Sequence, residues 1–100
     1  MKEDLKKIFR GHGLETQIRK FNEESDELRE AIIRADEHYK LQEWTNREYA
    51  EYHDHIAEEI ADNFVLLKQF QYYYGFSDEK IEEIMKFKIQ RTIEELENER

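Results

Sequence analysis

The chain has 100 residues, of which 38% are hydrophobic and 41% are charged, and its formal net charge at pH 7 is −9. Binding to nucleic acid or to an anionic membrane relies on a patch of Lys and Arg, so this acidic balance argues against both kinds of partner. The sequence contains no cysteine, which excludes disulfides and thiolate metal sites.

The composition predicts an all-α fold. Proline is absent and glycine occurs only three times, while residues with high helix propensity dominate. No internal repeat or linker is found, so residues 1–100 are expected to form a single domain. A short chain with few hydrophobic residues forms a marginal core, and we expect homo-oligomerisation to complete it. The N-terminus lacks the apolar core of a signal peptide, so the cytoplasm is the expected location.

The first half of the chain predicts a short helix and a long one. Residues 2–10 form an amphipathic helix that ends at Gly11-His12-Gly13. A long helix begins near Leu14 and fades near Ala35, because its apolar spacing by three and four stops there. The stretch 36–44 has no sustained period, so we interpret it as a connector that could contain a helical turn of its own.

The second half predicts two more helices. Thr45 to Glu48 fits a capping box, which marks the start of a second long helix that stops at Gly75. Ser77 is the expected N-cap of a last helix that frays near Glu97. The two long helices should pack antiparallel because their connector is short. Their predicted buried stripes are Leu14, Ile18, Phe21, Ser25, Leu28 and Ile32 on the first, and Tyr49, Tyr52, Ile56, Ile60, Phe64, Leu67 and Phe70 on the second.

Two acidic clusters, at residues 23–27 and 58–62, interrupt these long helices. Residues three apart share a helix face, so Glu24 pairs with Glu27, and Glu59 pairs with Asp62. The clusters lie about 16 residues before and about 18 residues after the expected turn, which is nearly the same height on an antiparallel hairpin. Four converging carboxylates suit Mg²⁺ or Mn²⁺.

Two interpretations of this spacing stay open. Acidic pairs with the same spacing recur elsewhere, for example Glu48 with Glu51 and Glu79 with Glu82, and a charged run is usually a solvated helix face. The apolar residues around both clusters favour a functional site instead. A di-iron bundle is excluded because no histidine follows a glutamate by three residues, and His53 and His55 are expected to have surface or packing roles.

The segments 17–31 (QIRKFNEESDELREA) and 55–67 (HIAEEIADNFVLL) resemble the MazG-like branch of the all-α NTP pyrophosphohydrolases, over roughly residues 12–95. The resemblance implies Mg²⁺-dependent hydrolysis of an NTP or dNTP to the monophosphate and pyrophosphate by a homodimer or homotetramer. It further implies that Glu24, Glu27, Glu59 and Asp62 are metal ligands, with Glu23 and Glu58 as neighbours. Glu27 would orient or deprotonate the attacking water.

The basic helix of this family matches less well. Family members often have a Lys, an Asn and an Arg there, whereas this chain has Lys86, Lys88 and Arg91. Lys88 and Arg91 are the candidates for contacting substrate phosphate. Asn63 is polar where the family usually has an aliphatic residue. The aromatic residues Trp44, Phe70, Tyr72, Tyr73 and Tyr74 could stack on a nucleobase, although such clusters are more often core or interface.

The alternative function is not enzymatic. A helical oligomerisation or interaction module with a degenerate acidic site would show the same amphipathic helices and the same charged faces. The two hypotheses differ in whether the carboxylates bind a cation.

Overall fold

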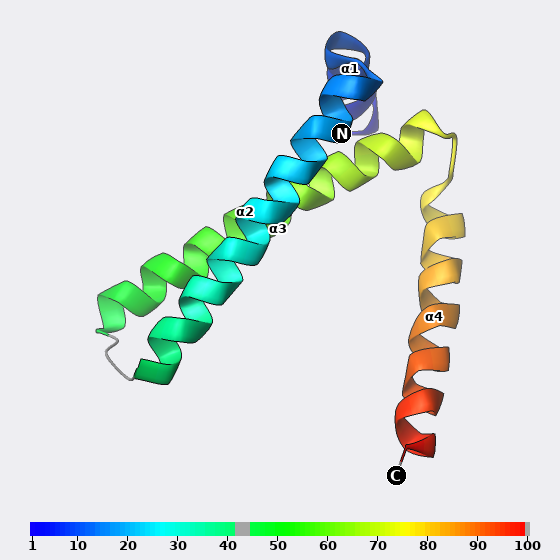
Figure 1. Ribbon diagram of the computed structural model, residues 1–100. Coiled ribbons are helices and arrows are strands. Elements are labelled where there is room, and N and C mark those ends of the chain that lie inside the picture. Colours follow the sequence, from blue (N-terminus) through cyan, green and yellow to red (C-terminus); the bar gives the residue numbers. More distant parts are fainter. Residues whose placement is uncertain (42–44, 100) are drawn as a thin grey trace.

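The computed structural model describes residues 1–41 and 45–99, apart from the side chains of Leu41 and Asn46. The described part is all-helical, with α1 at Lys2–His12, α2 at Leu14–Leu41, α3 at Asn46–Tyr73 and α4 at Asp78–Asn98. α2 and α3 lie side by side and antiparallel, α1 crosses the end of this pair, and α4 runs away from it (Figure 1). None of the described helices is long and apolar enough to cross a membrane.

α1 is longer than predicted, because it includes Gly11 and His12 and ends at Gly13. Gly13 has φ 86°, in the left-handed region that glycine tolerates best, and its N–H donates to the carbonyl of Phe9. Phe9 is buried in the same last turns. The packing of this residue outweighs the cost of about 1 kcal/mol for glycine inside a helix.

α2 is also longer than predicted, since the stretch 36–41 is helical and only 42–44, which include Trp44, lie outside the described residues. The prediction that 36–44 is a connector is therefore wrong for 36–41. Lys40 forms an ion pair of 2.9 Å with Asp36 one turn earlier, and the rings of His38 and Tyr52 lie 4.7 Å apart. Local pairs and a ring contact with α3 thus help to maintain a helix that lacks an apolar stripe.

The predicted helix starts are confirmed. The N–H of Glu48 donates to Thr45 Oγ1 at 3.1 Å, and the N–H of Thr45 donates to Glu48 Oε2 at 3.3 Å, which completes the capping box of α3. The N–H of Lys80 donates to Ser77 Oγ at 3.1 Å and caps α4. These short polar patterns fix where α3 and α4 begin.

Asp78, the first residue of α4, ties this helix to the end of α3. Its Oδ1 accepts hydrogen bonds from Lys68 Nζ at 2.7 Å, Gln71 Nε2 at 2.8 Å and the Tyr72 hydroxyl at 3.1 Å. The bonds from Lys68 and Gln71 lower the pKa of Asp78 to about 2. Beyond this corner α4 does not pack on the other described helices, and none of its described residues is buried.

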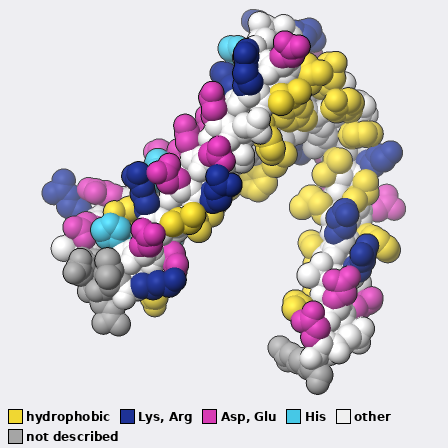
Figure 2. Space-filling model, viewed as in Figure 1, with side chains coloured by type: hydrophobic (Ala, Val, Ile, Leu, Met, Phe, Trp, Pro, Cys, Tyr) yellow, Lys and Arg dark blue, Asp and Glu magenta, His cyan; other side chains and the backbone are white. Residues whose placement is uncertain are grey.

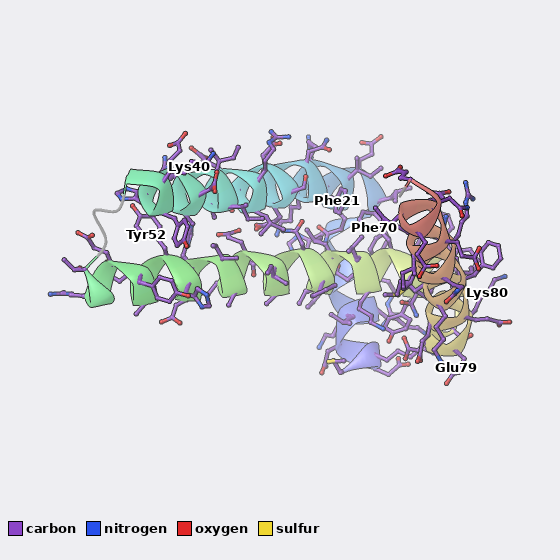
Figure 3. All side chains as sticks on the ribbon, turned by 90° about the horizontal axis from the view of Figure 1, so that it is seen from below. Phe21, Lys40, Tyr52, Phe70, Glu79 and Lys80 are labelled. Carbon is purple, nitrogen blue, oxygen red and sulfur yellow. The ribbon has the colours of Figure 1, made fainter. Side chains whose placement is uncertain are left out.

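The hydrophobic core is concentrated where α1 crosses the helix pair. The ring of Phe9 packs edge-on against Phe70, with centroids 5.8 Å apart, and stacks on Tyr73 at 4.6 Å. Phe70 also meets Phe21 edge-on at 6.0 Å, and Figure 3 shows these two residues facing each other between α2 and α3. Phe70 is thus half-buried at this crossing, whereas Tyr73 stacks on Phe9 from the surface and is 52% exposed.

The predicted buried stripes are only partly correct. Ile18, Ile32 and Phe64 are exposed, Phe64 by 61%, while the polar residues Gln17 and Asn63 are buried. The helix pair therefore turns a more polar face inward than the apolar pattern predicts. The half-buried members of the predicted stripes are Leu14, Phe21, Ser25, Leu28, Tyr52, Ile56 and Phe70, and the exposed ones are Ile18, Ile32, Tyr49, Ile60, Phe64 and Leu67.

Candidate metal centre

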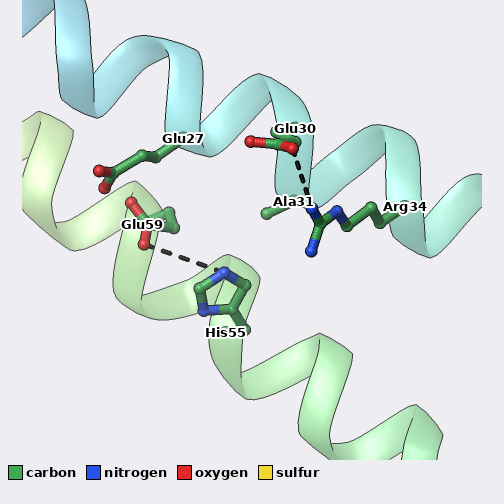
Figure 4. A pocket seen from close by; sticks show the side chains of 6 residues that line it. All are labelled: Glu27, Glu30, Ala31, Arg34, His55 and Glu59. Carbon is green, nitrogen blue, oxygen red and sulfur yellow. Dashed lines mark hydrogen bonds and ion pairs between the residues drawn. The ribbon is translucent and has the colours of Figure 1, made fainter.

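The antiparallel pair of α2 and α3 brings three of the predicted metal ligands together. Glu24, Glu27 and Glu59 each offer a carboxylate oxygen, and these oxygens lie within 4.8 Å of one another. Glu59 is 8% exposed, Glu24 is half-buried and Glu27 is exposed. Figure 4 shows the carboxylates of Glu27 and Glu59 pointing toward each other from the two helices. We call these three residues the acidic triad.

Asp62, the fourth predicted ligand, lies outside the triad. It is exposed on α3 and lines a cleft together with Glu24. Its charge still acts on the triad, because it raises the pKa of both Glu24 and Glu59. The neighbours Glu23 and Glu58 are exposed and are not part of the triad.

Asn63 joins the two helices at the backbone of two triad residues. Its Nδ2 donates to the backbone carbonyl of Glu24 at 3.0 Å and to that of Glu59 at 2.8 Å. One buried amide thus fixes the relative height of two triad residues. The sequence showed Asn63 only as a departure from the family pattern; a polar residue inside the apolar run of α3 was the available signal for this role.

The triad carries negative charge in a partly buried position. Burial, followed by the charges of Glu27, Asp62 and Glu59, raises the pKa of Glu24 to about 7. Burial also raises the pKa of Glu59, and the charge of Glu27 adds to this effect, while His55, 4.0 Å away, opposes it. Burial and the neighbouring carboxylates thus disfavour full ionisation of the triad.

Two buried oxygens in the triad lack a hydrogen-bond partner, Glu24 Oε2 and Glu59 Oε2. A buried carboxylate oxygen without a partner is costly, and a cation satisfies it. Mg²⁺ binds oxygen at 2.0–2.1 Å in octahedral geometry, which places its ligand oxygens about 3 to 4 Å apart. The spacing within the triad fits such an ion with small side-chain movements and with water in the remaining positions.

A cavity of about 260 Å³ adjoins the triad on the side facing the α2–α3 turn. Arg34 and His55 lie on its wall, and Arg34 forms an ion pair of 3.0 Å with Glu30 (Figure 4). Arg34 thus shares a cavity wall with Glu27 and Glu59, and its charge is paired with that of Glu30. The sequence interpretation missed it, although it follows Glu27 by seven residues and therefore shares its helix face.

Lys88 and Arg91, the candidates for contacting phosphate, lie on α4. Because α4 does not pack on α2, the structure does not bring either side chain to the acidic triad within one chain. Arg91 instead forms an ion pair of 3.2 Å with Glu95 on its own helix.

Comparison of the chain with protein-family models, with curated proteins and with solved structures found no match in any of the three.

Proposed function

We propose that this protein is a Mg²⁺-dependent nucleotide pyrophosphohydrolase that converts an NTP or dNTP to the monophosphate and pyrophosphate. The observation that carries the proposal is the acidic triad, with its two buried oxygens that lack a partner. The resemblance of the two acidic motifs to the MazG-like family supports this reaction over other uses of a metal. Such an enzyme removes unwanted nucleotides from the cytoplasm.

The residues of the site have distinct roles in this proposal. Glu24 and Glu59 are the most buried carboxylates of the triad and would hold the cation. Glu27 is exposed, so it can accept a proton from the attacking water or orient it. Bound Mg²⁺, or Mn²⁺ in its place, lowers the pKa of water and neutralises charge on the phosphates. Since the net charge of the chain is −9, a polyanionic substrate requires this compensation.

Arg34 lies on the wall of the 260 Å³ cavity, which Glu27 and Glu59 of the triad also line. We assign it to the distal phosphates, because a guanidinium binds phosphate oxygens in a bidentate manner. Lys88 and Arg91 would contact phosphate only if α4 of one copy lay over the triad of another.

The exposed apolar surface supports a homo-oligomer, a dimer or a tetramer. Figure 2 shows hydrophobic side chains gathered at the α3–α4 corner and continuing along α4. The chain exposes 8424 Å², whereas a compact folded monomer of this mass exposes about 6,100 Å². The excess of about 2,300 Å² per chain, or about 4,600 Å² per dimer, lies in the range of obligate homodimer interfaces.

The direct test is pyrophosphate release from a panel of NTPs and dNTPs with Mg²⁺. Monophosphate and pyrophosphate as products distinguish this reaction from that of a phosphatase. The double variant Glu59→Gln/Asp62→Asn should lose turnover and lose Mg²⁺-induced thermal stabilisation. It should also be more stable than the parent in metal-free buffer, because the like charges no longer repel.

Glu58→Gln is the matched control, since it removes an adjacent exposed charge outside the triad. It should keep turnover and the response to Mg²⁺. Absence of turnover on all nucleotides, together with no stabilisation by Mg²⁺, would contradict the proposal.

The exposed apolar face of α4 favours one second candidate, a non-enzymatic oligomerisation or interaction module with a degenerate acidic site. In that case the double variant would behave like the parent with and without Mg²⁺, while the oligomer would persist. The same set of measurements therefore separates the two functions.

A further inference from the structure

A pocket of about 250 Å³ lies between α1 and the C-terminal end of α3. None of the acidic triad residues lines it, so it is separate from the candidate metal centre. Two cations from α1, a buried amide from α3 and three aromatic rings surround it. The lining residues are Lys6, Arg10, Gln69, Phe9, Tyr72 and Tyr73.

Helix α1 contributes a row of cations. Lys2, Lys6 and Arg10 follow one another at intervals of four residues, so they lie along one face of the helix. Lys2 Nζ lies 5.1 Å from the centroid of the Tyr72 ring, which places this face against α3. Lys6 forms a long ion pair of 3.8 Å with the exposed Glu3, and Arg10 has no ion-pair or hydrogen-bond partner among the described residues. A long pair at the surface contributes little, so both charges are available to a ligand.

Helix α3 contributes an amide that is almost fully buried. Gln69 is 3% exposed, and its Oε1 accepts a hydrogen bond of 2.7 Å from Gln17 Nε2. Gln69 Nε2 donates to no partner within the described part of the chain. Unlike Gln17 Oε1, this nitrogen is not fully enclosed. A donor in a buried side chain calls for an acceptor, and a ligand in the pocket can supply one.

This end of the molecule is basic although the chain is acidic. Residues 1–20 contain six Lys or Arg and three Asp or Glu, a balance of +3, whereas the whole chain carries −9. The field around α1 therefore attracts an anion. The neighbouring 190 Å³ cleft, which Gln69 also lines, includes Glu24 and Asp62. An anion that accepts from Gln69 is therefore favoured on the side of the pocket.

The donors match a phosphate group. A phosphate monoester carries a charge of about −1.5 to −2 at pH 7 and three acceptor oxygens. Lys6, Arg10 and Gln69 supply two positive charges and three donor groups from two helices. A guanidinium binds two phosphate oxygens at once, which strengthens the contact. A carboxylate has one charge and two oxygens, so it would leave part of this donor set unmatched.

We propose that this pocket binds the phosphate group of a small ligand without a metal ion. The inference goes beyond the proposed function and does not depend on it, because the negatively charged triad repels phosphate when no metal is bound. The shared chemistry is a phosphate dianion. Its source is either a free inorganic anion or a nucleoside monophosphate whose ring contacts the aromatic wall of Phe9, Tyr72 and Tyr73. The volume lies below the roughly 300–1,000 Å³ of sites for drug-sized ligands, which favours a small ligand.

Titration calorimetry in metal-free buffer measures the binding of inorganic phosphate, pyrophosphate and nucleoside monophosphates. Arg10→Gln removes a charge at an exposed position and should weaken binding about tenfold or more. Lys7→Gln is the matched control, because it removes the same charge from an exposed neighbour that does not line the pocket. It should weaken binding by less than about threefold. Both variants should keep the Tm of the parent.

NMR spectroscopy shows where the ligand binds. The side-chain amide signals of Gln69 should shift during the titration. Those of Gln90 on α4, whose Nε2 donates to Glu94 at 3.2 Å, should stay in place.

The outcomes separate the two sources and the two proposals. Tighter binding of a nucleoside monophosphate than of inorganic phosphate identifies a nucleotide as the ligand, and equal or weaker binding identifies a free anion. The site would be overturned by the absence of binding in metal-free buffer, by equal weakening in Arg10→Gln and Lys7→Gln, or by equal binding of the dicarboxylate malonate. Phosphate binding without any nucleotide turnover would keep this site and contradict only the proposed enzyme.

Discussion

At the scale of single residues, the most unusual groups are Glu24 and Glu59, carboxylates that the helix pair draws away from water. Each leaves one oxygen without a hydrogen-bond partner, and burial, followed by the neighbouring charges of Glu27 and Asp62, raises the pKa of both. A proton or a cation relieves this repulsion. The proton and the cation therefore compete for the same site. The thermal stability of the protein should depend on which of the two is bound.

The pH dependence of stability in metal-free buffer follows from Glu24. Its pKa is raised from 4.5 to about 7 on folding, so the folded state binds the proton more tightly than the unfolded state. The resulting stabilisation is fully present below about pH 4.5 and is lost as the pH rises through about 7. In EDTA, the Tm of the parent should fall over this window, and Mg²⁺ should restore it at the upper end.

Glu24→Gln isolates this effect, since it keeps the shape of the side chain and removes its titration. Its Tm should depend less on pH between about 4.5 and 7 than that of the parent. An identical slope in both proteins would show that other groups cause the pH dependence.

Replacing Asn63 tests whether Mg²⁺ binding depends on how the two helices are held together, and not only on the charges of the carboxylates. Asn63→Ala removes the hydrogen bonds to the carbonyls of Glu24 and Glu59 and should lower the free energy of unfolding by about 1–3 kcal/mol. It should also weaken Mg²⁺ binding, although no carboxylate is changed. Chemical denaturation and titration calorimetry measure the two effects.

Asn22→Ala, at an exposed position of α2, is the control for this substitution. It should change the stability by less than about 0.5 kcal/mol. If Asn63→Ala binds Mg²⁺ as the parent does, Asn63 serves the fold alone.

The residues of the site differed in how far the sequence could predict them. Glu24, Glu27 and Glu59 could be found because the helical period and the position of the turn fix which carboxylates meet at one height. The roles of Asn63 and Gln17 could not be predicted, because each depends on a partner more than 35 residues away on another helix. A hydrogen bond across two helices leaves no periodic signal in either of them.

At the scale of helices, the sequence predicted the helix starts, which short polar patterns determine. It did not predict which helix faces are buried, because packing between helices determines that. The caps at Thr45 and Ser77 depend on residues within one turn. The buried face of α3 depends instead on how far the helix is rotated about its axis against α2. Since α3 is apolar on more than one side, the sequence alone did not determine which side packs inward.

The direction of α4 relative to α3 depends on Asp78. Asp78→Ala removes the acceptor of the bonds from Lys68, Gln71 and Tyr72, so α4 should sample a wider range of orientations. Because the protein has no cysteine, spin labels on Asp54→Cys and Glu97→Cys report the distance between α3 and α4 directly. The distance distribution should broaden in the Asp78→Ala background.

Glu79→Ala is the control, because it removes an acidic residue from the same first turn of α4 without breaking these three bonds. Its distance distribution should stay narrow. Equal broadening in both variants would mean that the charge at the helix N-terminus, and not the hydrogen-bonded corner, directs α4.

At the scale of the whole molecule, one chain is extended for its length. Its radius of gyration is 17.4 Å, compared with about 13 Å for a compact domain of 100 residues. The extension comes from α4, which buries none of its described residues and leaves Phe87 69% exposed. In the proposed homo-oligomer, the same surface of a second copy of the chain would cover these apolar side chains.

Oligomer formation should therefore depend on the apolar side chains of α4. The double variant Phe87→Asp/Ile93→Asp changes two residues that are exposed in the single chain, so the isolated fold should tolerate it. Sedimentation should show the parent as a dimer or tetramer and the variant as a monomer. Gln90→Glu, an added charge on the same helix, should remain oligomeric, whereas a parent that sediments as a monomer would contradict the prediction.

Mixed oligomers can show whether α4 of one copy completes the site of another. Within one chain, Lys88 and Arg91 lie on a helix that does not pack beside the triad, so any contact with substrate must come from a second copy. Glu59→Gln alone and Lys88→Ala/Arg91→Ala alone should both be inactive. When the two are unfolded, mixed and refolded, some oligomers combine an intact triad with an intact α4 from the partner, and up to about a quarter of parental activity should return for a dimer. If the Lys88→Ala/Arg91→Ala variant retains parental activity, neither residue contacts phosphate and Arg34 is sufficient as the phosphate-binding cation.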